Sequence, residues 1–326
     1  MPSRTDRRDG MILQAALSDI DIDFIDGVDG KTIPDKAVPL LKPHDRLPDA
    51  SIGSWRGHMN AIREIVKLKL SSALILEDDI DWDVRIKDQL YDFALSAQAL
   101  AQPLEGSNQT YTDSAHSNDP EYPLTFAIPF ERLPRTRPVQ ASPYGDNWDV
   151  LWIGHCGMSF PFKHTAVPKG SVVHRNDFTV PNRRHLWGYN EPFTLKESFQ
   201  DHTSVVHHAQ EGVCTFAYAV SYKGAVKMLE DVALSDMSDA FDFLLRFFCE
   251  GDRGMRAHKC LAHQPGLFFS HRPRGPLKSD SDIRDKGDGF RDKAYTDMVR
   301  LSVRLNAHAI IDGTELTDQY PDEDIL

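Results

Sequence analysis

The sequence has no apolar run long enough to cross a bilayer, which takes roughly 20 consecutive residues. Its most apolar stretch, 241–249, is interrupted by Asp242 and Arg246. The chain opens on MPSRTDRRDGM, without the apolar segment of a signal peptide. We therefore expect no membrane segment in this chain.

Positive charge is scarce. Lys and Arg total 37 against 49 Asp and Glu, which gives a net charge of −12. Proteins that bind nucleic acid gain much of their affinity by neutralising phosphates with basic residues. The composition therefore argues against a nucleic-acid partner, and any polyanionic ligand would need a local basic patch.

Cysteine is also scarce, and the four cysteines form no C-x-x-C pair. A zinc site made from them is therefore not expected, whereas disulfides remain open. The triplet Asn108-Gln109-Thr110 matches a glycosylation acceptor pattern, which matters only in a secretory compartment. Such triplets also arise by chance.

Apolar residues make up 40% of the 326 positions, enough for one large or two modest cores. Apolar spacing predicts a helix over 58–70, and the uniformly apolar 73–76 predicts a strand covered on both faces. Residues 19–24 alternate acidic and apolar, the pattern of a half-buried strand. A helix followed by a buried strand indicates an α/β fold.

The remaining segments divide into regular and irregular parts, and no internal repeat is present. We expect a helix from Asp83, its N-cap, to Leu100, strands at 149–154 and 214–220, helices at 223–234 and 238–249, and helical spacing over 295–307. Three segments are expected to be irregular. Residues 101–147 form a partly mobile insertion that serves as a lid or a solvated linker, and residues 318–326 form a frayed acidic tail. Residues 161–210 form a polar stretch in which His207 and His208 lie on a surface loop.

The densest group of chemically active side chains is the segment LILEDDIDWD. Its carboxylates are Glu77, Asp78, Asp79, Asp81 and Asp83. Ligands bind at the carboxyl ends of strands in open α/β sheets, and a divalent cation would offset the repulsion among these acids. Oxygen ligands suit magnesium, manganese or calcium rather than zinc. The other interpretation is a solvated turn and a helix start that favours acids.

An EF-hand loop does not fit, because Val84 and Leu90 stand where that loop needs Gly and Glu.

The stretch 53–83, with His58 opening a helix and ALILEDD closing a strand, resembles glycosyltransferase family 25. This family includes bacterial lipooligosaccharide galactosyltransferases and collagen galactosyltransferases. Further segments are similar to family segments in the same order: RTDRRDGM, FIDGVDGK, DVLWIGHCG, FAYAVSYKGAVKML, SDAFDFLL and QPGLFFSHRPRGPLKSDSDI. Together they span most of the chain outside the insertion and the tail.

The resemblance implies a GT-A-like α/β fold, with a Rossmann-like mixed sheet flanked by helices in one domain over 1–290. A C-terminal helix and acidic tail would follow at 291–326. It also implies transfer of a hexose, commonly galactose, from a UDP-sugar donor to a hydroxyl of a glycan or glycoprotein. Manganese, or magnesium, would be the cofactor, and eukaryotic relatives work in the secretory pathway.

By the same resemblance, Asp79 would bind the metal, with Glu77 as a second ligand. Glu77 or Asp78 would touch ribose, sugar or a metal-bound water. If the chemistry is inverting, a carboxylate must take the acceptor proton. Asp242 is the first candidate and Asp239 the second, although Asp242 also fits a helix-surface acid.

Positive side chains for the diphosphate would come from one of two groups. They are Arg4, Arg7 and Arg8, or His271, Arg272, Arg274 and Lys278. His58 would pack beside the donor, although a capping or core histidine fits equally well. His155 follows a strand end and fits either a site or a structural turn.

The chain departs from the family pattern in two places. Met-Pro-Ser stands where relatives have an apolar first strand, so we expect a sheet that lacks this strand and exposes an edge. The segment from Gly53 to His58 also differs from the common Gly-Cys…Ser-His. A catalytically inactive carbohydrate- or nucleotide-sugar-binding relative is therefore the alternative function, and a calcium-binding structural module is a third.

Overall fold

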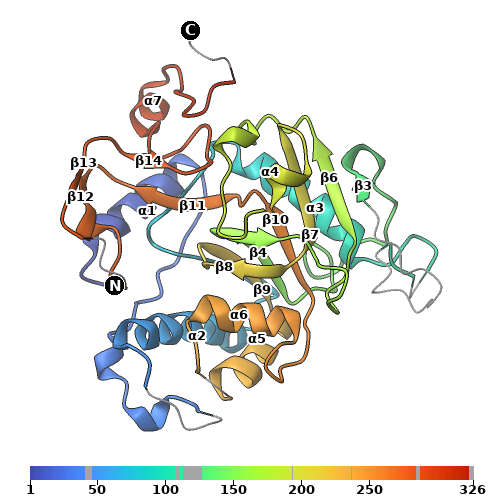
Figure 1. Ribbon diagram of the computed structural model, residues 1–326, viewed down its shortest axis with the longest axis horizontal. Coiled ribbons are helices and arrows are strands. Elements are labelled where there is room, and N and C mark those ends of the chain that lie inside the picture. The colour runs from blue at the N-terminus through green and yellow to red at the C-terminus, as the bar shows by residue number, and fades with distance from the viewer. Residues whose placement is uncertain are drawn as a thin grey trace.

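The computed structural model describes residues 1–40, 46–107, 110–112, 127–192, 194–235, 237–283 and 287–322. Within these residues a seven-stranded mixed sheet lies at the centre (Figure 1). Its strand order is β1 (Ser72–Leu76), β9 (Ala217–Ser221), β4 (Val150–Gly154), β10 (Cys260–Gln264), β7 (Thr203–His208), β6 (Ser171–Arg175) and β3 (Ala127–Pro129). The predicted α/β fold with a mixed sheet flanked by helices is confirmed.

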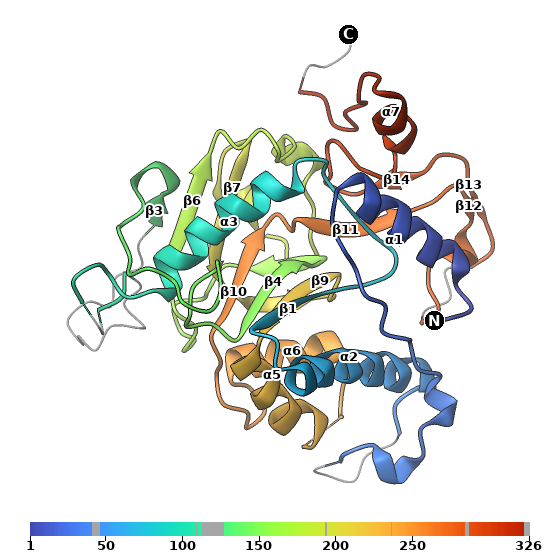
Figure 2. The ribbon, with the colours of Figure 1, turned by 180° about the vertical axis from the view of Figure 1, so that it is seen from behind.

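Helices cover both faces of this sheet. Helices α2 (Asp49–Leu68), α5 (Tyr222–Met228) and α6 (Phe241–Glu250) lie on one face, and α3 (Ile86–Ala101) lies on the other (Figures 1 and 2). Strand alternation divides the core accordingly. Val150 and Trp152 of β4 pack with the three-helix side, whereas Leu151 and Ile153 pack with α3.

A second, three-stranded sheet lies beside the main one. It consists of β14 (Tyr295–Thr296), β11 (Phe268–Arg272) and β2 (Ile80–Trp82). Helices α1 (Thr5–Leu17) and α7 (Ala307–Asp312) contact each other near it.

The short elements complete the described part of the chain. They are the pairs β12 (Gly275–Pro276) with β13 (Phe290–Arg291) and β5 (Gly157–Ser159) with β8 (Gln210–Val213), helix α4 (Leu195–Ser198), a π-helical turn Leu229–Ala233 that continues α5, and 3₁₀ turns Gly30–Thr32, Asp35–Ala37, Phe130–Arg132, Arg183–His185 and Leu277–Ser279.

Helix α2 shows why this sequence folds as it does. Ile52, Met59 and Ile62 recur at helical spacing, and all are fully buried. The FIDGVDGK turn packs closely on the helix, since a Cβ on Gly53 would lie 2.4 Å from the Val28 carbonyl oxygen. The helix begins at Asp49, nine residues before the predicted start, so His58 lies in its middle rather than at its opening.

Two strand predictions need correction. Residues 19–24 form no strand: Ile20 and Ile22 instead pack as irregular chain against the core under α3. The 73–76 segment is a strand, but it is not covered on both faces. In the described residues β1 pairs with β9 alone, at the sheet edge, and Leu74 is 40% exposed.

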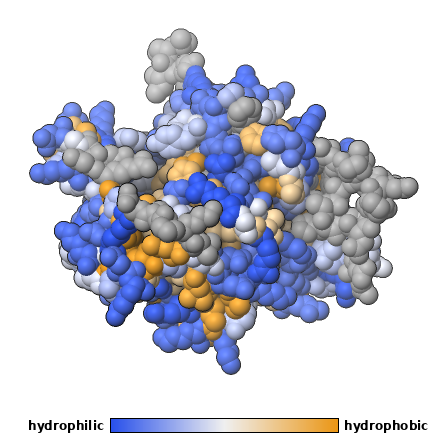
Figure 3. Space-filling view, turned by 60° about the horizontal axis from the view of Figure 1, so that its bottom comes forward, coloured by the Kyte–Doolittle hydropathy of each residue, from blue (hydrophilic) through white to orange (hydrophobic). Residues whose placement is uncertain are grey.

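The exposed edge belongs to a side of the molecule with several uncovered apolar residues. Leu68 of α2 and Val226 of α5 are 59% and 44% exposed. Figure 3 turns this helix side toward the viewer and shows apolar areas set in a mostly hydrophilic surface. Single exposed apolar residues are ordinary for a folded domain. Among the described residues, no helix is both long and apolar enough to cross a membrane.

Other local predictions were also wrong. Helix α3 begins at Ile86, and Asp83 is not its N-cap but accepts hydrogen bonds from Arg85. The 161–210 stretch supplies strands β6 and β7, so His207 and His208 are buried in the sheet rather than on a loop. Residues 295–307 form β14 and turns, and helix α7 begins only at Ala307.

The insertion and the tail are also more structured than predicted. Within 101–147, strand β3 extends the main sheet by pairing with β6. In the tail, Asp318 accepts hydrogen bonds from the Arg300 guanidinium, and Tyr320 bonds the Thr296 carbonyl oxygen. Residues 108–109, the first two of the glycosylation triplet, residues 113–126 and residues 323–326 lie outside the described residues.

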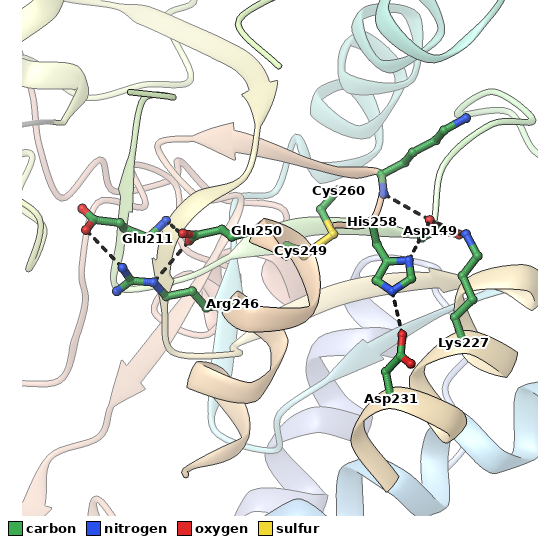
Figure 4. Close-up of a disulfide and its surroundings, with 10 residues drawn as sticks. Asp149, Glu211, Lys227, Asp231, Arg246, Cys249, Glu250, His258 and Cys260 are labelled. Atoms are coloured by element: carbon green, nitrogen blue, oxygen red, sulfur yellow. Dashed lines mark hydrogen bonds and ion pairs between the residues drawn. A yellow bond between two sulfur atoms is a disulfide. The ribbon is translucent and has the colours of Figure 1, made fainter. Parts of the chain in front are cut away.

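All four cysteines are paired, which settles the question that the spacing left open. Cys156 bonds Cys214, and Cys249 bonds Cys260. The second disulfide joins α6 to β10. Beside it, the Lys227 ammonium donates to the Asp149 carboxylate, with 2.7 Å between Lys227 Nζ and Asp149 Oδ1 (Figure 4).

Buried histidines make the stability of the fold sensitive to acid. The Gln264 amide donates to Nε2 of His207 and the His208 carbonyl accepts from Nδ1, so the ring is neutral. Burial lowers the pKa of His207 from 6.5 to about 3. As pH falls below 6.5, the unfolded chain takes up a proton that the native ring excludes, so stability is lost.

We predict that His207→Gln reduces the pH dependence of the unfolding free energy by about 1.4 kcal/mol per pH unit between pH 6 and pH 4. Urea unfolding over a pH series measures this slope. The exposed His308 on α7 provides a control, since His308→Gln should keep the wild-type slope. Equal slopes in wild type and His207→Gln would contradict the prediction.

We also predict that the two disulfides differ in their contribution to stability. They close loops of 58 and 11 residues, so loop-closure entropy assigns about 4 kcal/mol to the first and about 3 kcal/mol to the second. Urea unfolding of Cys156→Ala/Cys214→Ala should therefore show a larger loss than Cys249→Ala/Cys260→Ala. Both double variants remove the same atoms, so the reverse order would rule out the loop argument.

Candidate active site

Three carboxylates lie together where β1 ends. The Glu77 N–H bonds the Phe216 carbonyl, which extends the β1–β9 ladder by one residue, and Asp78 and Asp79 follow. Arg7 of α1 faces them, with Nη1 at 2.7 Å from Asp78 Oδ1 and Nη2 at 3.5 Å from Asp79 Oδ2. The terminal amine of Met1 lies 3.4 Å from Asp78 Oδ2. The site therefore already attracts cations.

The surroundings of Asp79 disfavour the charged form of its carboxyl group. Burial raises the pKa of Asp79 from 3.8 to about 6, and the charge of Glu77 adds to the shift. The charges of Arg7 and Arg272 oppose it. A half-buried carboxylate of this kind is stabilised by additional positive charge nearby.

The other two acids of the predicted cluster lie elsewhere. Asp81 is fully buried and accepts hydrogen bonds from Gln14 Nε2 at 3.0 Å and Thr296 Oγ1 at 2.7 Å. Asp83 pairs with Arg85 and accepts from the Leu301 N–H. The group of five that the sequence predicted is therefore a group of three, and the other two acids hold the fold together.

His58 connects Glu77 to the core. Its Nδ1 lies 2.9 Å from the Tyr218 hydroxyl, its Nε2 lies 3.5 Å from Glu77 Oε1, and its ring stacks on Phe241 at 4.1 Å. Burial raises the pKa of Tyr218 well above its usual value, so the phenol stays protonated. His58 is therefore held by Tyr218 and Phe241, with its other ring nitrogen facing Glu77 beside the acids.

Asp242, in the first turn of α6, lies at the same edge. Its Oδ2 accepts from the Cys214 N–H at 3.1 Å, and the next residue, Thr215, donates from its hydroxyl to Glu77 at 3.2 Å. The carboxylates of Asp242 and Glu77 thus accept hydrogen bonds from two consecutive residues, Cys214 and Thr215, just before β9. Cys214 has a φ of +61°, a conformation fixed by its disulfide and by Asp242.

Asp239 faces a different direction. Its Oδ2 lies 3.3 Å from the Arg253 guanidinium, and its Oδ1 accepts from the Ala240 N–H. In the described residues no contact brings Asp239 to Glu77, Asp79 or Cys214.

The basic residues predicted for the diphosphate divide between site and scaffold. Of the N-terminal arginines, Arg7 faces the acids, whereas Arg4 pairs with Asp6 and Asp282 and Arg8 pairs with Asp26.

On β11, Arg272 acts on Asp79 through its charge, whereas the His271 ring turns to Thr296, with Nδ1 at 2.9 Å from Oγ1. Burial lowers the pKa of His271 to about 3, so the ring is neutral. The His271 backbone N–H donates to the Asp79 carbonyl at 2.7 Å.

Sequence reasoning missed Arg304, Thr215 and Tyr218. Arg304 Nε donates to Gln14 Oε1 and to the Ile80 carbonyl, and burial lowers the pKa of the guanidinium. Its Nη2 is buried and has no hydrogen-bond partner among the described residues. No sequence signal identified Arg304, because it lies in the segment predicted to be a helix.

The donor atoms suit a cation that is shared with a phosphorylated ligand. In the part of the chain that the structure describes, no group of three His, Cys, Asp or Glu side chains could hold a metal ion alone. Magnesium bound with phosphorylated substrates usually takes only one or two protein carboxylates and completes its shell with substrate and water oxygens. Asp79 and Glu77 fit such a pair, because a cation would offset the repulsion between them.

A pocket lies at the same edge, beyond the Cys156–Cys214 disulfide. Its lining includes His155 and Cys156, which follow β4, the end of β10 and the loop 186–188. His155 lines it, but His155 Nε2 bonds the His263 carbonyl and burial lowers the pKa of His155 to about 4. His155 is therefore a neutral structural residue.

Comparison with known proteins identifies the family of the chain. A search of curated proteins finds no match. The sequence model of glycosyltransferase family 25 (LPS biosynthesis protein) matches residues 1–244, which are 244 of the 326 positions. The match includes α1, the acids after β1 and Asp242. The chain therefore belongs to glycosyltransferase family 25.

Proposed function

We propose that this glycosyltransferase moves a hexose, with galactose as the first to test, from a UDP-sugar to a hydroxyl of a glycan or glycoprotein. The observation that carries the proposal is the group Glu77, Asp78 and Asp79 beside Arg7 at the end of β1, in a chain of family 25. The same group supports a GT-A-like arrangement as part of the proposal, since strand ends are where α/β sheets bind nucleotides.

Asp79 and Glu77 would hold manganese or magnesium. When bound, the metal neutralises the diphosphate and stabilises the charge on the departing UDP. Arg7 and Arg272 contribute positive charge on the same side, and Arg7 can exchange its carboxylate partners for phosphate oxygens, which guanidinium binds equally well. Asp78 would contact the donor, and His58 would orient Glu77.

Asp242 would act as the base of an inverting transfer. The acceptor hydroxyl oxygen forms a bond to the anomeric carbon, the bond from that carbon to the UDP oxygen breaks, and the hydroxyl proton passes to the Asp242 carboxylate. The Cys214 and Phe243 N–H groups hold this carboxylate in a fixed orientation. Asp239 is the second candidate for this role, and its pairing with Arg253 makes it the weaker one.

The alternative is a catalytically inactive nucleotide-sugar-binding relative. The observation in its favour is that Arg7 already pairs with Asp78 and lies close to Asp79. Calorimetry that shows UDP binding without any turnover of nucleotide sugars would support this alternative.

We place the protein's working environment in an oxidising compartment, such as the lumen of the secretory pathway. The support is that all four cysteines form disulfides, which persist where thiols are not kept reduced.

We predict that Asp79→Asn slows UDP release from UDP-galactose in the presence of manganese by at least about 100-fold, because a metal ligand contributes several kcal/mol to stabilising the leaving group. A coupled assay for UDP measures this rate. Asp23→Asn removes an exposed acid outside the site and should keep the wild-type rate. Wild-type release no faster than that of Asp79→Asn would contradict the donor site, whereas turnover of a different nucleotide sugar alone would change only the donor.

We further predict that Asp242→Asn lowers kcat by about 100-fold or more, in the range of general-base catalysis, while UDP affinity is unchanged. Asp239→Asn is the matched comparison three residues away, and it should lower kcat far less. Single-turnover kinetics and UDP calorimetry on both variants separate the two candidates. A larger loss in Asp239→Asn would reverse the assignment.

A further inference from the structure

Two aromatic side chains stand exposed beside the pocket beyond the disulfide, and Trp187 is part of its lining. Trp187 is 38% exposed and Tyr189 is 70% exposed, and their rings meet edge to face with centroids 5.6 Å apart. The other four tryptophans, by contrast, are buried: Trp55, Trp82, Trp148 and Trp152. A folded chain that buries every other tryptophan and leaves this one at a pocket mouth has a surface suited to a ligand.

The loop that carries these rings is held in place on both sides. The Tyr189 N–H donates to the Cys156 carbonyl at 3.1 Å. The Trp187 side chain bonds the Asp297 carboxyl, and its backbone N–H contacts the Met298 sulfur at 3.4 Å. Rigid aromatic side chains give a large contact area at a low entropic cost, so this pair is preorganised for binding.

The close fit of the loop requires glycine on the opposite strand. Asn190 donates to Ser159 Oγ at 3.1 Å and to the Glu211 carbonyl at 2.8 Å. A Cβ on Gly157 of β5 would lie 2.1 Å from Asn190 Oδ1. The aromatic pair is therefore fixed against β5 and β8 rather than hanging free in solvent.

A short covalent and hydrogen-bonded path leads from the aromatic pair to the candidate base. Tyr189 bonds the backbone of Cys156, Cys156 is joined by its disulfide to Cys214, and the Cys214 N–H bonds Asp242. The residues that hold the aromatic pair therefore also hold Asp242, so we assign the pair to the acceptor side of the site. The acids Glu77 and Asp79 lie beyond Thr215, on the donor side.

We propose that Trp187 and Tyr189 form the binding platform for a hexopyranose ring of the acceptor glycan, an inference that rests on the proposed function. The axial C–H bonds of a pyranose present a weakly positive, apolar face, which suits the negative face of an aromatic ring. Lys196, which lines the same pocket as Trp187, supplies a polar group for the sugar hydroxyls. The acceptor is accordingly a saccharide rather than a bare serine or lysine side chain.

The first test uses Trp187 as its own reporter. Acrylamide quenching of tryptophan fluorescence in the full chain reports mainly on this residue, because the other four are buried. Titration with lactose, maltose and cellobiose should lower the quenching constant at least about twofold, with affinities in the millimolar range expected for one stacked ring. Trp187→Phe should abolish the signal. Absence of protection by all three disaccharides overturns the platform, and so does protection by UDP alone.

The second test measures transfer to the disaccharide that protects Trp187. Trp187→Ala and Tyr189→Ala should each raise the KM for this acceptor about tenfold, the equivalent of about 1.4 kcal/mol, and leave the KM for UDP-galactose unchanged. Tyr91→Ala removes an equally exposed tyrosine, 66% exposed on α3, and serves as the matched control.

The two tests separate the platform from the proposed function. Turnover with an acceptor KM that neither platform variant changes overturns the platform and leaves the transferase intact. Saccharide protection of Trp187 in a chain that turns over no nucleotide sugar supports the platform and overturns the transferase.

Discussion

The arrangement of the site depends on one buried carboxylate, Asp81. It is fully buried, and burial raises its pKa. An unpaired charge in such a place would cost several kcal/mol, so its bonds must be satisfied. Gln14 of α1 and both Thr296 and Ser302 of the C-terminal segment donate to it. One side chain of β2 therefore joins two segments that are more than 280 positions apart.

This constraint also sets the geometry at the acids. Gln14 and Arg7 are separated by two helical turns, so they lie on the same face of α1, with the buried Met11 between them. With Gln14 fixed on Asp81, Arg7 is brought onto Asp78 and Asp79. The positive charge of Arg7 thus lies at the site because Gln14, on the same helix, hydrogen-bonds the buried Asp81 carboxylate. The acidic residues that give the net charge of −12 therefore include some that hold the fold together and others that remain available for chemistry.

Strands and helices that are determined by local apolar spacing were predicted correctly from the sequence. The strands at 149–154 and 214–220 and the helices after them follow from apolar spacing, and the structure has them as β4, β9, α5 and α6. Residues 19–24 were predicted wrongly, because alternation makes a strand only where a neighbouring strand offers hydrogen bonds. His207 was predicted wrongly because its neutral ring is satisfied by Gln264, 57 positions away in sequence. The contact of Arg304 with Gln14 is equally invisible to local pattern.

The topology explains why distant segments meet at this one edge. Strands β1 and β4 both run antiparallel to β9, and β10 runs parallel to β4, so all three end at the edge where β9 begins. The acids follow the end of β1, Cys156 follows β4, the pocket-lining residues Pro265 and Gly266 follow β10, and Cys214 precedes β9. The disulfide locks two of these ends together and holds Cys214 in the left-handed conformation that points its N–H at Asp242. The ends of these strands thereby become the part of the molecule where donor, base and acceptor groups can be fixed relative to one another.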